Sequence, residues 1–161
     1  MELPLPPAGP GEFVELELPA RPEVVALARL VVGAVAAAEP LFDEARGADL
    51  RLAVSEACTN AIQAQMKGHE GADPAASIVL RCSVEDGQIK LAVQDHGGGF
   101  DPNDLAEHPE VTDPARLDFE GGLGIPLIRL LADDTQFYPS PGGTTVVMIF
   151  GPRNAAEHST S

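Results

Sequence analysis

Two polar side chains on one predicted helix have the types and the spacing of a ligand site. Glu56 and Asn60 are four residues apart, so on an α-helix they lie about 40° from each other around the axis. A carboxylate there can accept a proton from water or a hydroxyl, and an amide oxygen is a suitable ligand for Mg²⁺. Taken alone, the pair fits two solvated surface residues better than a ligand site, because any helix carries such pairs.

An acidic residue ends a predicted strand on the side that the strand buries. Asp95 continues the alternation of Ile89, Leu91 and Val93, so its side chain points to the apolar face. A buried carboxylate needs hydrogen-bond donors, and the exocyclic amino group of a purine is one suitable partner. The alternative is that Asp95 caps the backbone amides of the glycine turn that follows it.

Two glycine clusters flank a long loop after that strand. Glycines let backbone N–H groups approach phosphate oxygens, and a helix N-terminus adds a favourable positive potential. One such cluster is more often only a turn, whereas two of them around a loop that follows a strand-end Asp indicate an anion site. The first cluster is Gly97, Gly98 and Gly99, and the second is Gly121, Gly122, Leu123 and Gly124, with Ile125 next in the helix.

The elements that must position these residues follow from hydrophobic periodicity. Alternation predicts strands over 13–18, 78–84, 89–93, 135–138 and 144–150, and helical spacing predicts helices over 22–39, 48–66 and 123–132. The order is strand, two helices, hairpin, long loop, helix, hairpin. It predicts an α+β fold, a two-layer sandwich with helices on one face of a mainly antiparallel mixed sheet.

Composition limits the organisation and the function classes. We expect one domain over 12–151, between a flexible N-terminal extension (1–11) rich in Pro and Gly and a flexible polar tail (152–161). The net charge of −15 argues against direct binding to nucleic acid or to anionic membranes. We expect no membrane span, and both cysteines, Cys58 and Cys82, lack metal-site spacing. Two core cysteines and no signal peptide indicate a cytoplasmic protein.

Taken in order, the motifs resemble those of a known superfamily. The segments Glu56-Ala-Cys-Thr-Asn60-Ala, Asp95-His-Gly97-Gly-Gly99, Gly122-Leu-Gly124 and Gly143-Thr-Thr145 resemble the N box, the two glycine boxes and the closing Gly-Thr-Thr of the GHKL ATPases, which share the Bergerat ATP-binding fold. Within that superfamily the chain is most similar to the bacterial anti-sigma-factor serine/threonine kinases. The likeness extends from about Phe13 to Phe150.

The resemblance implies a role for each matching residue. Glu56 would be the general base, Asn60 would hold Mg²⁺, and Asp95 would receive the adenine amino group of ATP. The other ATP-binding positions would be Gly97, Gly99, Gly121, Gly122, Leu123, Gly124 and Ile125 around the phosphates and Thr144 or Thr145 at the adenine. The implied partners are a sigma factor and a STAS-type anti-anti-sigma protein that accepts phosphate on a serine, and a homodimer is also a family expectation.

The sequence departs from the family pattern at two positions. Ala64 stands where many relatives carry His, and Glu120 precedes the second glycine box where some carry Arg. Both departures weaken the case for phosphate transfer more than the case for binding. They leave open an alternative, a non-catalytic ATP-binding regulator that switches partners with nucleotide state. The cation for the γ-phosphate also stays open between Arg116 and Lys67.

Overall fold

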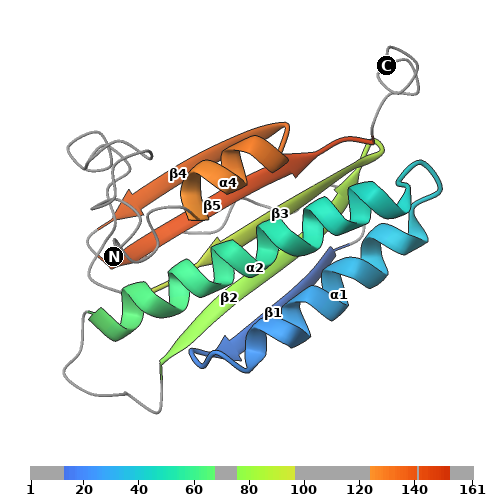
Figure 1. Ribbon diagram of the computed structural model, residues 1–161. Coiled ribbons are helices and arrows are strands. Elements are labelled where there is room, and N and C mark those ends of the chain that lie inside the picture. The colour runs from blue at the N-terminus through green and yellow to red at the C-terminus, as the bar shows by residue number, and fades with distance from the viewer. Residues whose placement is uncertain (1–12, 68–75, 97–123, 141, 153–161) are drawn as a thin grey trace, which may run out of the picture.

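Five strands and three helices form two layers in the computed structural model, which describes residues 13–67, 76–96, 124–140 and 142–152. The helices lie on one face of the sheet (Figure 1). Within these ranges no helix is long and apolar enough to cross a membrane. The elements in chain order are β1 (Phe13–Pro19), α1 (Val24–Ala38), α2 (Glu44–Lys67), β2 (Ser77–Glu85), β3 (Gln88–Gln94), α4 (Gly124–Leu131), β4 (Asp134–Ser140) and β5 (Gly143–Phe150).

The sheet has the strand order β1-β2-β3-β5-β4, and every ladder between the described strands is antiparallel. A two-residue turn joins β2 to β3, with positive φ at Asp86 (53°) and Gly87 (76°), as a tight hairpin requires. Because β5 pairs antiparallel with β3, with Gln94 opposite Thr145, the end of β3 lies beside the start of β5. The predicted fold class is therefore confirmed, with no parallel pair among the described strands.

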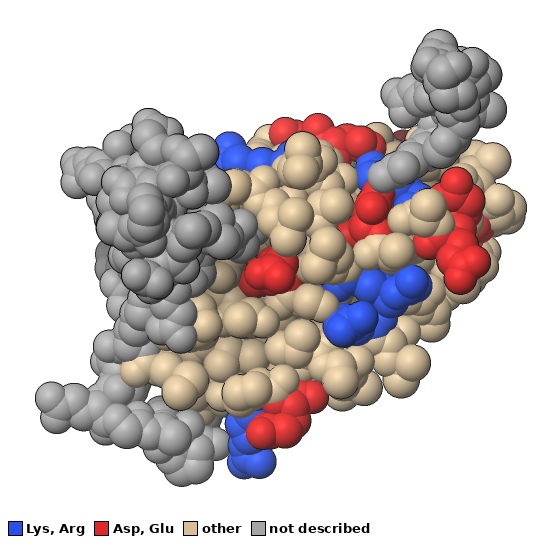
Figure 2. Space-filling model, viewed as in Figure 1, with Lys and Arg blue, Asp and Glu red and all other residues tan. Residues whose placement is uncertain are grey.

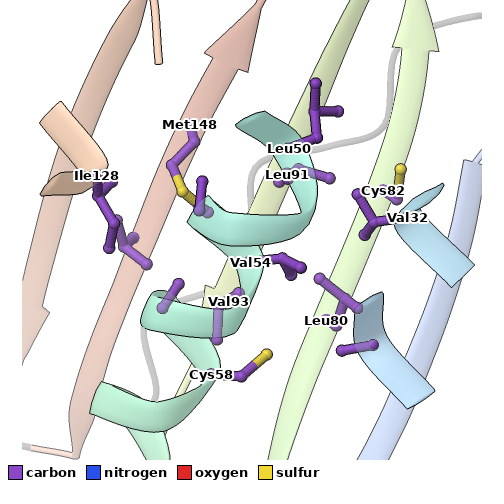
Figure 3. Close-up of a cluster of buried hydrophobic side chains, with 14 of the residues drawn as sticks. Val32, Leu50, Val54, Cys58, Leu80, Cys82, Leu91, Val93, Ile128 and Met148 are labelled. Carbon is purple, nitrogen blue, oxygen red and sulfur yellow. The ribbon is translucent and has the colours of Figure 1, made fainter. Parts of the chain in front are cut away.

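The core fills the space between α2 and the sheet. The apolar residues whose helical spacing underlies the prediction of a helix over 48–66 form one stripe of α2, and this stripe is buried: Leu50, Val54, Ala57 and Ala61. Figure 3 shows Leu50, Val54 and Cys58 of α2 near side chains of β2 and β3. The long helix α2 is thus held along its length, and its border residues are fixed relative to the strand ends.

The observed start of α2 is earlier than the predicted start at Ala48. Asp43 precedes the helix, and its Oδ1 accepts a hydrogen bond of 2.7 Å from the backbone N–H of Arg46, which is an N-cap arrangement. The prediction began where the apolar stripe begins and missed the polar first turn. The opposite error occurs at α1, where Pro22 and Glu23 form a turn and the helix begins at Val24.

Both cysteines are core residues, as predicted. Cys58 and Cys82 are free and buried, and burial raises the pKa of each thiol to about 12. The fold therefore favours the protonated thiols. The stability that the fold gains from keeping these thiols protonated is fully present below the ordinary thiol pKa of 9.0. It is lost as the pH rises through the folded-state pKa of about 12.

We expect the native thiols to resist modification at pH 8. With a pKa of about 12, roughly one thiol in ten thousand is ionised at that pH, and both are shielded by the core. Ellman's reagent should label neither cysteine in the native protein within an hour and both in urea. Rapid labelling of the native protein would contradict the burial of these side chains.

Candidate functional site

The helix α2 presents the predicted pair at the border of its packed stripe. Glu56 and Asn60 are both half-buried, while Ala57 and Ala61 beside them are buried. Each side chain therefore starts at the edge of the core and reaches outward on one face of the helix, as the spacing predicted. Ala64 is half-buried one turn further along the same face.

The second part of the site lies where β3 ends and β5 begins. Asp95 directly follows β3 and is 6% exposed, and its backbone N–H donates to the carbonyl oxygen of Thr144 at 2.9 Å. Asp95 points to the same sheet face as Val93, and Thr144 points to the same face as Val146, because the residues of each pair are two apart along a strand. Val93 and Val146 are both in the core. Cross-strand partners in an antiparallel pair point to the same face, so Asp95 and Thr144 meet on the side that α2 covers.

The register separates the two candidate threonines. Thr145 pairs with Gln94 and alternates with Thr144, so its side chain points to the sheet face opposite the helices. It is completely buried, and its hydroxyl has no hydrogen-bond partner in the described part of the chain. Thr144, and not Thr145, therefore shares a face with Asp95.

A close backbone contact fixes this corner, and motif spacing alone did not single it out. Gly143 has φ of 148°, a backbone conformation that side chains disfavour. A Cβ placed there would lie 2.0 Å from the carbonyl oxygen of Asp95 and 3.0 Å from the Cα of His96. Only glycine lets β5 start this close to the end of β3. The signals available in the sequence were the Gly143-Thr-Thr145 motif and the Pro-Gly pair before it.

The third element is α4, which packs against α2. It begins at Gly124, and Ile125 is buried in its first turn. The remaining predicted phosphate residues, Gly97, Gly99, Gly121, Gly122 and Leu123, lie outside the described residues, as do Arg116 and Glu120. The structure thus packs α2 against α4, β3 and β5, the elements that carry Gly124 and the Asp95–Thr144 corner.

The donor set at this site suits magnesium bound to phosphates better than magnesium alone. No group of three or more His, Cys, Asp or Glu residues in the described ranges could hold a metal ion. Mg²⁺ usually keeps waters and takes few protein ligands together with substrate phosphates. One half-buried amide, Asn60, fits that requirement, and it lies on the helix that packs against α4, whose first residue is Gly124.

Residues 18–150 match the histidine kinase-like ATPase domain family. The chain belongs to this family. The family's match begins in β1 and ends with β5, so it includes all three parts of the site. The predicted superfamily is therefore confirmed.

Curated relatives are similar over nearly the whole chain. The serine-protein kinase RsbW of Bacillus pumilus is 34% identical over 155 residues, which cover 93% of each chain. RsbW of Bacillus subtilis is 31% identical over 94% of this chain and 93% of its own. RsbW of Listeria innocua is 34% identical over 83% of this chain and 84% of its own. The predicted likeness to anti-sigma-factor serine kinases is borne out.

Solved structures share the fold of this family member. The RsbU and RsbW domains of a Mycobacterium tuberculosis protein match with a TM-score of 0.63 at 20% identity, over 91% of this chain and 34% of that chain. A blue-light activated histidine kinase of Erythrobacter litoralis matches with a TM-score of 0.53 at 21% identity, over 72% of this chain and 33% of that one. The chain spans about a third of each of these larger proteins.

Proposed function

We propose that this protein is a Mg-ATP-dependent serine/threonine protein kinase that acts as an anti-sigma factor. It phosphorylates a serine of a STAS-type anti-anti-sigma partner and sequesters a sigma factor. The supporting observation is the similarity to serine-protein kinases over 93% of both chains. The ATP-binding unit is residues 12–151. Free, buried cysteines are consistent with work in a reducing cytoplasm, and a homodimer is an expectation from the family.

Asp95 and Thr144 would receive the adenine. Asp95 is 6% exposed at the rim of the core, where a carboxylate gains most from a polar donor. The exocyclic amino group of adenine would donate to it, and the Thr144 hydroxyl, which both donates and accepts, would bind beside it. Thr145 retains no role at the base in this proposal, because it points to the other sheet face.

Asn60 and the glycines would hold the phosphate end. The Asn60 amide oxygen would ligate Mg²⁺, which neutralises phosphate charge during transfer. The backbone N–H groups near Gly124 at the start of α4 would face the phosphates. Lys67, at the end of α2, or Arg116 would supply a cation for the γ-phosphate. The other members of the cradle would be Gly97, Gly99, Gly121, Gly122, Leu123 and Ile125.

Glu56 would act as the general base. Its carboxylate accepts the proton of the attacking serine hydroxyl as the serine oxygen bonds to the γ-phosphorus and the bond to the β,γ-bridging oxygen breaks. Phosphoserine and ADP are the products. Phosphoryl transfer needs little more from a protein than this alignment and charge neutralisation.

The direct test is incubation of the protein with Mg-ATP and candidate anti-anti-sigma proteins, followed by detection of phosphoserine. The kinase proposal requires one modified serine on a partner. The alternative, a non-catalytic regulator, is favoured by Ala64 one turn after Asn60. It predicts ATP-dependent partner exchange without phosphoserine, and that outcome would contradict the kinase proposal.

Replacing Glu56 with glutamine should leave ATP binding intact and slow transfer about 10²- to 10⁴-fold, because the amide cannot take the serine proton. Glu44→Gln is the matched control, since Glu44 is an exposed residue in the first turn of the same helix. Single-turnover phosphorylation and isothermal titration separate the two steps. Equal rates for Glu56→Gln and wild type would remove Glu56 from the mechanism.

Replacing Gly143 with alanine should weaken Mg-ATP binding about tenfold, because the new Cβ displaces the Asp95 backbone and misplaces the carboxylate. Gly87→Ala is the control: Gly87 has φ of +76°, but a Cβ there meets nothing within 4 Å. Both variants should lose stability through backbone strain. Only Gly143→Ala should lose ATP affinity, and an equal loss in both variants would refute the role of this contact.

A further inference from the structure

A buried arginine near the start of α2 joins four segments of the fold. Nε of Arg46 donates to the carbonyl of Gly151 at 2.9 Å, and Nη1 donates to the carbonyl of Leu131 at 2.9 Å and to Asp49 at 3.1 Å. Nη2 donates to Asp133 at 2.9 Å. The guanidinium thus connects α2 with the last residue of α4, the turn before β4 and the residue after β5. We call this set of contacts the Arg46 junction.

Further contacts surround the guanidinium of Arg46 and the carboxylate of Asp133. The guanidinium carbon lies 5.0 Å from the ring centroid of Phe150. The second carboxylate oxygen of Asp133 accepts from the backbone N–H of Gly151 at 2.6 Å, and the backbone N–H of Asp133 donates to Ile149 at 2.9 Å. The Arg46 side chain is 5% exposed. This end of β5 is the one opposite Gly143 and the candidate site.

The helix α4 depends on such contacts for its placement. It has eight residues, fewer than the roughly 12–15 that an isolated helix needs in water. Ile125 and Ile128 bury its inner face, but hydrophobic contacts have no preferred direction. The hydrogen bond from Arg46 to the Leu131 carbonyl is directional. It therefore adds a directional constraint on how α4 lies along α2.

The two ends of α4 serve different parts of the molecule. The last residue of α4, Leu131, accepts a hydrogen bond from Arg46, whereas the first residue, Gly124, lies at the phosphate end of the proposed site. Eight residues span about 12 Å, so a tilt of about 5° around Leu131 would move Gly124 by about 1 Å. Arg46 and Asn60 belong to the same helix, about 21 Å apart along its axis. Figure 1 shows α4 and α2 on the same face of the sheet.

We infer that Arg46 is a positioning residue for the phosphate end of the nucleotide site. Arg46 holds the last turn of α4 against α2 and the end of β5. This contact limits the tilt of α4 and so keeps the position of Gly124 constant relative to Asn60. The proposed adenine residues, Asp95 and Thr144, lie at the end of β3 and the start of β5, away from the end of β5 that the Arg46 junction contacts. This inference rests on the proposed function, because it assigns the start of α4 to the phosphates.

Two matched substitutions test the inference without removing Arg46. Asp133→Asn loosens the contact of Arg46 with the corner between α4 and β4, while Asp49→Asn loosens a contact with Arg46 inside α2. Both replace a carboxylate partner of the same guanidinium by an amide. The dissociation constants of Mg-ATP and of adenosine, which has the base but no phosphate, are measured for each variant by titration.

Asp133→Asn should raise the dissociation constant of Mg-ATP about 3- to 10-fold and change that of adenosine less than about twofold. Asp49→Asn should leave both within about twofold, although both variants melt a few degrees lower. Equal changes in the two variants, or equal weakening of Mg-ATP and adenosine, would overturn the positioning role. Failure of the wild type to bind Mg-ATP would overturn the proposed function as well.

Discussion

Replacing Arg46 with methionine is expected to lower the free energy of unfolding by about 3 kcal/mol. The methionine keeps apolar contact with Phe150 but removes every hydrogen bond of the guanidinium. The carbonyls of Leu131 and Gly151 then lose a donor, and Asp49, whose side chain is 15% exposed, loses its cation. Asp133 loses less, because its side chain is 54% exposed and water can replace the arginine. Urea denaturation followed by circular dichroism measures the change.

Arg29→Met is the control for this experiment. Arg29 is exposed on α1, so its replacement should change the free energy of unfolding by less than about 0.5 kcal/mol. If Arg46→Met were as stable as Arg29→Met, the Arg46 junction would not hold the fold together, and the positioning role inferred for it would fail too.

Replacing Asn60 with alanine is expected to weaken Mg-ATP binding by about 100-fold or more while leaving the melting temperature within a few degrees of wild type. The substitution removes the proposed metal ligand. It costs the helix little, because alanine is the better helix former and Asn60 is half-buried. Isothermal titration with ATP in Mg²⁺ and in EDTA measures both affinities. The affinities for ATP in Mg²⁺ and in EDTA should become similar in the Asn60→Ala variant.

Ser55→Ala supplies the matched control on the same helix. The Ser55 hydroxyl donates to the carbonyl of Arg51 at 2.7 Å, so it is occupied within the helix and should contribute nothing to the metal. Its replacement should leave the Mg²⁺ dependence of ATP binding unchanged. Normal Mg-ATP binding by Asn60→Ala would remove Asn60 from the metal site.

Much of the fold was predictable because local periodicity and tertiary burial agree. The alternation of Ile78, Leu80 and Cys82 and the stripe of Leu50 and Val54 predicted which faces enter the core, and those side chains are buried. The hairpin between β2 and β3 was predicted from the two alternating segments 78–84 and 89–93, and Asp86-Gly87 forms its turn. The exact start of α2 was not predicted, because its first turn is polar and depends on the Asp43 cap.

Features that depend on distant partners were not predictable. The partners of Arg46 beyond α2 lie 85 to 105 residues away in sequence. No local sequence pattern predicts contacts between residues so far apart. The choice between Thr144 and Thr145 needed the register of β3 against β5. The close approach of Gly143 to Asp95 likewise required coordinates.

The charge pattern of the surface adds little to the identification of the site. Figure 2 shows that the basic side chains on the helical face form small separate groups among uncharged and acidic surface. The net charge of −15 argues against nucleic acid and anionic membranes as partners, but it does not indicate where on the protein a nucleotide binds. The order of Glu56, Asn60, Asp95 and the glycines carried that prediction.

The most direct test of the central claim is a crystal structure of the protein with Mg²⁺ and a non-hydrolysable ATP analogue. We predict that the adenine amino group donates to the Asp95 carboxylate beside Thr144 and that the Asn60 amide oxygen ligates Mg²⁺. An analogue bound elsewhere, or bound with Asp95 and Asn60 out of contact, would contradict the proposed site.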